Sequence, residues 1–110
     1  KGKTEKEKKK LIKDAEALEQ SGAFGIVLEC VYSDISKKIT KLIKIPTIGI
    51  GASIHCDGQV LVTDDILGLT DAKIKFVKKY ANIKKIINSA VSKFRQEVKS
   101  GKYPTKKYSY

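Results

Sequence analysis

The 110-residue sequence contains no methionine, no tryptophan, one histidine and one arginine. Because methionine is absent, we expect the chain to lack its natural start. No apolar run approaches the ~20 residues that a membrane span needs, and no secretory signal pattern precedes the first helical segment. We therefore expect a cytoplasmic protein without a membrane partner.

Cysteine and histidine are too scarce for several kinds of catalytic or metal site. Cys30 and Cys56 lack the CxxC spacing of a zinc site, and in a reducing cytoplasm we expect both to be thiols rather than a disulfide. His55 stands beside Cys56 and Asp57, but adjacent residues rarely chelate one metal, so we interpret it as a loop residue. A single histidine also gives no basis for a Ser-His-Asp or Cys-His arrangement.

Positive charge is abundant, with a net charge of +11. Such a charge is compatible with a module that binds nucleic acid or another polyanion. However, Arg95 is the only arginine, whereas base and phosphate recognition depend strongly on bidentate arginine. We therefore expect a solvated, lysine-rich surface and no nucleic-acid partner, with polyanion binding as the alternative.

The first segments read as a helix followed by a strand. Thr4 and Glu7 form the T-x-x-E pattern of a capping box, and apolar residues at helical spacing continue to an exit near Gly22. The run FGIVLEC, residues 24–30, is short and β-branched, which is typical of a strand covered on both faces.

The middle of the chain continues the alternation. A second helix is expected from Ser33 or Asp34 to the Ile45-Pro46 pair, since proline pushes its predecessor to extended geometry. TIGIGA, residues 47–52, indicates a second buried strand, and this order predicts a parallel α/β sheet within a single domain, residues 1–110. The expected inner face of the second helix is Ile35, Ile39, Leu42 and Ile43.

A third strand, GQVLVTD, is expected from Gly58. Its six-residue link from the second strand is short for a parallel crossover, and we expect one helical turn to suffice rather than an antiparallel strand. A short helix after Asp71 and a long one from Ile83 follow, the latter closed by Gly101 and Pro104. The tail, residues 101–110, is expected on a surface or against a partner. The apolar positions that mark the short helix are Ile74, Val77 and Ala81.

Glu29 is the first candidate for chemistry. Alternation along a strand puts Val27, Glu29 and Val31 on one face, with Glu29 near the carboxyl end, where α/β folds bind ligands. One interpretation is a glutamate paired with a neighbouring lysine or a helix terminus. The other is a carboxylate whose pKa is raised by partial burial and which takes a proton from a substrate.

The glycine-rich run after the second strand is the second candidate. Ile54 stands where a dinucleotide fingerprint needs glycine, so the run is not that motif. Glycines at a strand end allow close approach of the backbone to a neighbour or a small ligand, and we take Gly51 and Ala52 as candidates for substrate binding. Asp64 and Asp65 are adjacent in the expected third strand, so they would face opposite ways and form no carboxylate dyad.

Six strings, in order, carry a family resemblance that runs from residues 2–4 through the tail. GAFGIVLECV, IPTIGIGA, CDGQVLV, DILGL, KFVKKYA and EVKSGKYP closely resemble the ketopantoate hydroxymethyltransferases. The resemblance implies a (β/α)8 TIM barrel of about 250 residues. This chain would be its C-terminal part, about three βα units with parallel strands and flanking helices.

The resemblance also implies a reaction. The family transfers a hydroxymethyl group from 5,10-methylenetetrahydrofolate to the 2-oxo acid 3-methyl-2-oxobutanoate (α-ketoisovalerate), giving 2-dehydropantoate for pantothenate synthesis, with the help of magnesium. Its proton acceptor corresponds to Glu29. The family's metal ligands lie upstream of Lys1, so we expect no metal ligand in this segment, no activity of the segment alone, and a homo-oligomer for the full-length enzyme.

Three positions depart from the family pattern near the expected mouth of the barrel. Ser53 stands in place of a glycine, Asp64 in place of a histidine, and Tyr32 in place of a proline. Two other hypotheses stay open: a remnant that packs against a partner, and the polyanion-binding module. Loss of proton exchange in a Glu29→Gln variant would favour the enzyme, and a steep salt dependence of polyanion binding would favour the module.

Overall fold

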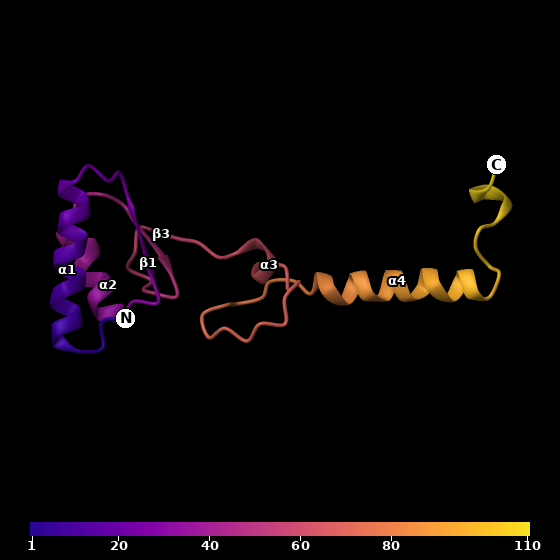
Figure 1. The fold of residues 1–110 in the computed structure, drawn as a ribbon, viewed down its shortest axis with the longest axis horizontal. Coiled ribbons are helices and arrows are strands. Elements are labelled where there is room, and N and C mark those ends of the chain that lie inside the picture. Colours follow the sequence, from indigo (N-terminus) through magenta and orange to yellow (C-terminus); the bar gives the residue numbers. More distant parts are fainter. The chain divides into compact units, whose positions relative to one another are not determined.

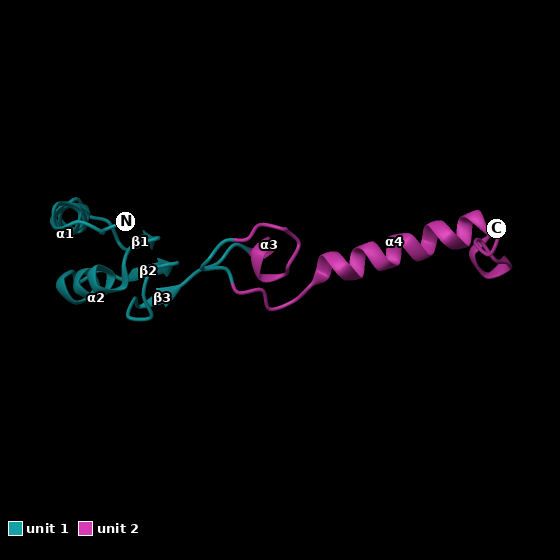
Figure 2. Ribbon diagram, turned by 90° about the horizontal axis from the view of Figure 1, so that it is seen from below, with its two compact units in different colours: residues 1–62, 74–77 teal, residues 63–73, 78–110 magenta.

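The computed structural model describes residues 1–110 and divides them into two compact units (Figure 2). Unit 1 comprises residues 1–62 and 74–77, and unit 2 comprises residues 63–73 and 78–110. That residues 1–110 form a single domain stays a prediction. The structure contains no helix with the length and hydrophobicity that a membrane span requires.

Unit 1 is an α/β unit built on a parallel three-stranded sheet. Along the chain its elements are α1 (Glu5–Gln20), β1 (Ile26–Glu29), α2 (Ser33–Leu42), β2 (Thr47–Ile50) and β3 (Gly58–Gln59). The strand order is β1-β2-β3, with both neighbouring pairs parallel. The predicted parallel direction of the third strand is thus confirmed, whereas the helical turn expected in its link is wrong, because the link contains only turns and bends.

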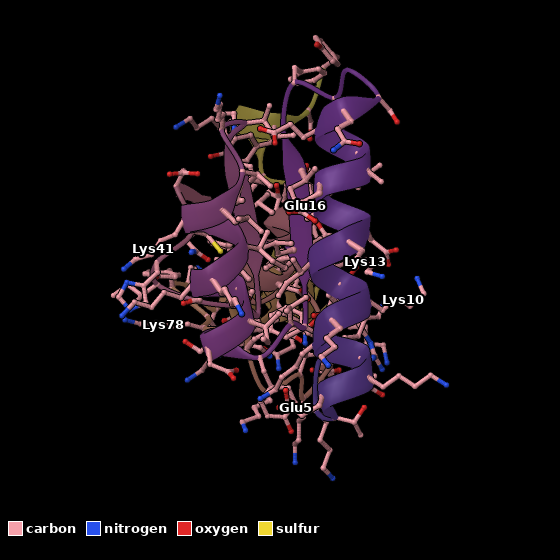
Figure 3. All side chains as sticks on the ribbon, turned by 90° about the vertical axis from the view of Figure 1, so that its left-hand side faces the viewer. Glu5, Lys10, Lys13, Glu16, Lys41 and Lys78 are labelled. Atoms are coloured by element: carbon pink, nitrogen blue, oxygen red, sulfur yellow. The ribbon has the colours of Figure 1, made fainter.

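The core of unit 1 lies between the sheet and its two helices. α1 and α2 both lie on the same side of the strands (Figures 1 and 2). Lys10 and Lys13 extend from α1 toward solvent (Figure 3), consistent with a solvated lysine surface. Between the sheet and the helices, the burial of apolar side chains supplies most of the stability of such a unit. The buried hydrophobic residues are Ala15, Ile26, Leu28, Val31, Ile35, Ile39, Ile43 and Cys56.

The amino end of α1 has the predicted capping box. The Thr4 hydroxyl accepts the Glu7 N–H at 3.2 Å, and the Glu7 carboxylate accepts the N–H groups of Lys3 at 2.7 Å and Thr4 at 3.2 Å. These backbone bonds satisfy donors that an uncapped helix would leave without a partner. The capping residue and the reciprocal bonds were both predictable from four letters of sequence.

We expect the capping box to weaken in acid. The N–H of Thr4, followed by that of Lys3, lowers the pKa of Glu7 below its ordinary value of 4.5. Because the folded pKa is depressed, the stabilisation is fully present above about pH 4.5 and is lost as the pH falls through the folded pKa. NMR titration of the Lys3 and Thr4 amides should give a midpoint below 4.5, and a midpoint at or above that value would contradict the geometry.

A hydroxyl pair secures the amino end of the sheet. Thr47 is fully buried, and its hydroxyl lies 2.8 Å from that of Thr40 on α2. The Asp57 carboxylate accepts the Thr47 N–H at 2.8 Å and its O–H at 3.1 Å. Buried polar groups of this kind are tolerated because each has a partner. This network joins α2, β2 and the start of β3.

Unit 2 contains α3 (Thr63–Ile66), α4 (Ile83–Lys99) and the 3-10 helix η1 (Lys106–Tyr108). The long helix predicted from Ile83 is confirmed, and Gly101 follows it with φ of 69°, a left-handed conformation that glycine adopts at no steric cost. No residue of α4 is buried. Its apolar stripe is exposed at Ile86, Ile87, Val91, Phe94 and Val98.

Two predictions about the third quarter of the chain are wrong. The strand from Gly58 ends at Gln59, and Asp64 and Asp65 lie in α3, where the buried Asp65 carboxylate accepts the Thr70 hydroxyl at 2.8 Å. No helix forms over residues 74–81. Short helices are marginal without a buried face, and Ile74 stays 41% exposed.

Candidate active site

The carboxyl ends of β1 and β2 form the edge of the sheet at which the sequence predicts a catalytic and substrate-binding site. Glu29 pairs with Ile50 in the sheet, and the Cys30 N–H donates to the Ile50 carbonyl at 3.0 Å. Directly after these residues, Cys30 has φ of 52° and Gly51 has φ of 61°. Each of these neighbouring strands is thus followed directly by a left-handed residue. For Cys30 this conformation is strained, and such strain concentrates at functional sites.

Glu29 lies on the sheet face that α1 and α2 do not cover. Ile26 and Leu28 of β1 are buried, whereas Val27 and Glu29 are exposed. The prediction that both strand faces are covered, and with it the partial burial of Glu29, is wrong for this chain. The reason is that no element of unit 1 packs on the second face. Phe24, just before β1, is 95% exposed.

The Glu29 carboxylate is also free of partners. It makes no ion pair and no side-chain hydrogen bond, although Lys1 lies close enough to line the same pocket. The predicted alternative, a glutamate paired with a neighbouring lysine or a helix terminus, is therefore not found. A carboxylate at a strand end that makes no ion pair and no side-chain hydrogen bond has its oxygen atoms free to accept a proton.

Gly51 and Ala52 line an open pocket of about 690 Å³ at this edge. Glu29 does not line it; Glu29 lines a separate pocket of about 290 Å³ beside the outer edge of β1. The two groups of candidates therefore lie on neighbouring strand ends but in different hollows. The residues around the larger pocket are Cys30, Val31, Tyr32, Ser33, Gly51, Ala52, Ser53, Ile54, Gln59, Lys75 and Phe76.

The close approach at Gly51 is made by Phe76. A Cβ at position 51 would lie 2.5 Å from the Phe76 ring, so only glycine fits beneath it. Sequence reasoning missed Lys75 and Phe76 as pocket residues because it placed them in a helix. The glycine at the end of β2 was the one signal of a close neighbour there.

Three side chains hold the turn after β2. The Ser53 hydroxyl is 3.1 Å from that of Ser33, at the start of α2, and accepts the His55 N–H at 3.2 Å. The Gln59 side-chain amide donates to the Ser53 carbonyl at 2.7 Å. Gly49 makes room for this amide, since a Cβ there would lie 2.9 Å from the Gln59 Oε1 atom. Ser53 itself is only 4% exposed.

The residues of the chain do not form a metal site. No three side chains among histidine, cysteine, aspartate and glutamate lie close enough together to hold a metal ion. Both cysteines are free thiols, as predicted.

Comparison with known proteins gives a consistent result over the whole chain. The family model described as ketopantoate hydroxymethyltransferase matches residues 1–106. The 3-methyl-2-oxobutanoate hydroxymethyltransferase of Pelagibacter ubique is 58% identical over 110 residues, which cover 100% of this chain and 43% of the relative. The enzymes of the same name from Sulfurisphaera tokodaii and Thermotoga maritima are 52% and 51% identical over 97% and 99% of this chain, and over 40% and 41% of their own lengths. The chain thus spans well under half the length of these curated relatives.

Proposed function

Because this chain belongs to the ketopantoate hydroxymethyltransferase family, we propose that it is the C-terminal part of an enzyme that makes 2-dehydropantoate from 3-methyl-2-oxobutanoate. In this proposal its parallel strands and flanking helices are about three βα units of a (β/α)8 barrel. The one-carbon donor is 5,10-methylenetetrahydrofolate. The complete polypeptide is a homo-oligomer in the cytoplasm.

The chemistry assigned to this segment is proton removal. The Glu29 carboxylate takes the proton from C3 of the oxo acid, and the electron pair of that C–H bond becomes the enolate. The enolate carbon then forms a bond to the one-carbon unit at the formaldehyde level. The two C–N bonds between that unit and the folate break, and water supplies the new hydroxyl group. Tetrahydrofolate leaves with the proton from C3 and one proton from water on its two freed nitrogens. Magnesium, when bound by residues outside this segment, polarises the 2-oxo group.

The observation that carries the proposal is the position of Glu29. Its carboxylate stands at the carboxyl end of a parallel strand, on the sheet face without helices, and has no structural partner. In barrels of this class the catalytic groups project from the carboxyl ends of the strands. An unpaired carboxylate at that position supports the assignment of Glu29 as the general base.

The experiment uses the complete polypeptide, meaning residues 1–110 joined to the portion by which the relatives exceed this chain. We expect it to form 2-dehydropantoate from the oxo acid and 5,10-methylenetetrahydrofolate, with mass spectrometry as the readout. Omitting either co-substrate should abolish product. Failure to form product with both present, in a protein shown to be folded by circular dichroism, would reject the proposed function.

A further inference from the structure

We propose that Ser53 is a positioning residue that couples the turn after β2 to the start of α2 and thereby fixes the large pocket at the carboxyl ends of β1 and β2. Its kinetic part rests on the proposed function, whereas its structural part does not. The coupling has three members, Ser33, Ser53 and Gln59, which we call the turn clamp. Every member lines the pocket of about 690 Å³.

Ser53 is held from several directions. Its hydroxyl bonds sideways to Ser33 at 3.1 Å and accepts the His55 N–H, which lies ahead in the turn. Its carbonyl accepts the Gln59 amide from β3 at 2.7 Å. A residue tied to α2, to β3 and to its own turn cannot shift without breaking several bonds at once.

The turn clamp lies just beyond Glu29 and its partner in the sheet. The turn begins at Gly51, directly after Ile50, which pairs with Glu29 and accepts the Cys30 N–H. Ser33 begins the helix that follows β1. The turn clamp therefore joins the segments that leave β1 and β2 just beyond the predicted base. A displacement of 1 Å in such supporting residues can cost catalysis substantially.

Other hydrogen bonds hold the fold at the opposite end of the sheet. The Thr40 and Thr47 hydroxyls, 2.8 Å apart, form a second hydroxyl pair that also joins α2 to β2. That pair lies at the amino ends of the strands, away from the pocket. Substitutions in the two hydroxyl pairs can therefore be compared, so that an effect on the stability of the fold is distinguished from an effect on the position of the pocket wall.

The test compares Ser53→Ala with Thr40→Val in the complete polypeptide. We expect Ser53→Ala to raise KM for at least one co-substrate by about 5- to 20-fold with a smaller change in kcat, because the lost hydrogen bonds hold the pocket wall. Thr40→Val should lower the melting temperature and leave KM within about twofold, as expected for a bond outside the pocket. Ser33→Ala should reproduce the effect, and the double variant should add little to it.

Hydrogen exchange tests the proposal without measuring enzyme activity. In the 110-residue chain, Ser53→Ala should speed hydrogen exchange of the His55 amide by about tenfold, while the Thr47 amide, held by Asp57, should keep its rate. Gln59→Glu, which cannot donate to the Ser53 carbonyl, serves if Ser53→Ala does not fold. Unchanged exchange at His55, or equal KM effects of Ser53→Ala and Thr40→Val, would overturn the proposal. An inactive wild type would reject the proposed function alone, and the exchange rates would still decide the coupling.

Discussion

Replacing Glu29 by glutamine is expected to slow proton exchange at C3 of 3-methyl-2-oxobutanoate by about 10²- to 10⁴-fold in the complete polypeptide. Glutamine keeps the size and polarity of the side chain but cannot accept a proton at neutral pH. Because Glu29 makes no ion pair and no side-chain hydrogen bond in unit 1, the substitution removes no structural contact there. Folding should therefore be preserved while proton removal is lost.

The exchange is measured by NMR, as the loss of the C3 proton signal of the oxo acid in D2O. This readout needs no folate, so it separates proton removal from carbon transfer. Glu16→Gln is the matched control: it makes the same chemical change on α1 (Figure 3), away from both strand ends, and should leave the exchange rate unchanged. An exchange rate in Glu29→Gln within a factor of a few of wild type would remove Glu29 from the role of base.

Local signals were enough to predict most of unit 1. The capping box set the start of α1, and short β-branched runs marked β1 and β2. The shared exposure of Val27 and Glu29 follows from alternation along β1, but Val31, which alternation assigned to the same face, is buried in the core. These features depend on a few neighbouring residues, which is why one sequence suffices to predict them.

Features that depend on distant parts were predicted less well. The second face of β1 was expected to be covered, yet Val27 is 62% exposed. A strand's own residues show that the face is apolar but not whether a covering element is present in the same chain. The segment that carries Lys75 and Phe76 was placed in a helix because its apolar spacing allows one. Only the three-dimensional structure shows that Phe76 lies over Gly51.

The turn clamp shows the same limit in another form. Ser53 differs from the glycine of the family pattern, and the sequence alone gave no role for its side chain. The structure supplies its contacts with Ser33 and Gln59, residues 20 and 6 positions away. Hydrogen bonds from a turn to the start of a helix or to a neighbouring strand have no periodic signature, so no pattern in the sequence could have indicated them.

The 110-residue chain without the remaining portion is expected to show no turnover, at least about 10³-fold below the complete polypeptide. Three features of unit 1 lead to this expectation. The face that carries Glu29 is exposed, β1 pairs with β2 alone and leaves one edge open, and no three histidine, cysteine, aspartate or glutamate side chains are grouped closely enough to hold a metal ion. A reaction that develops an enolate is favoured where protein dipoles and ions replace water, and an exposed face provides neither.

The comparison uses the isolated chain and the complete polypeptide at equal concentration, with product detected by mass spectrometry. Circular dichroism of the isolated chain should still show helix, because α1 and α2 bury their own core against the sheet. Retained helix with no product would assign the deficit to the missing face rather than to unfolding. Product from the isolated chain, abolished by Glu29→Gln, would instead mean that residues 1–110 hold the whole catalytic apparatus, and the barrel would not be needed for the chemistry.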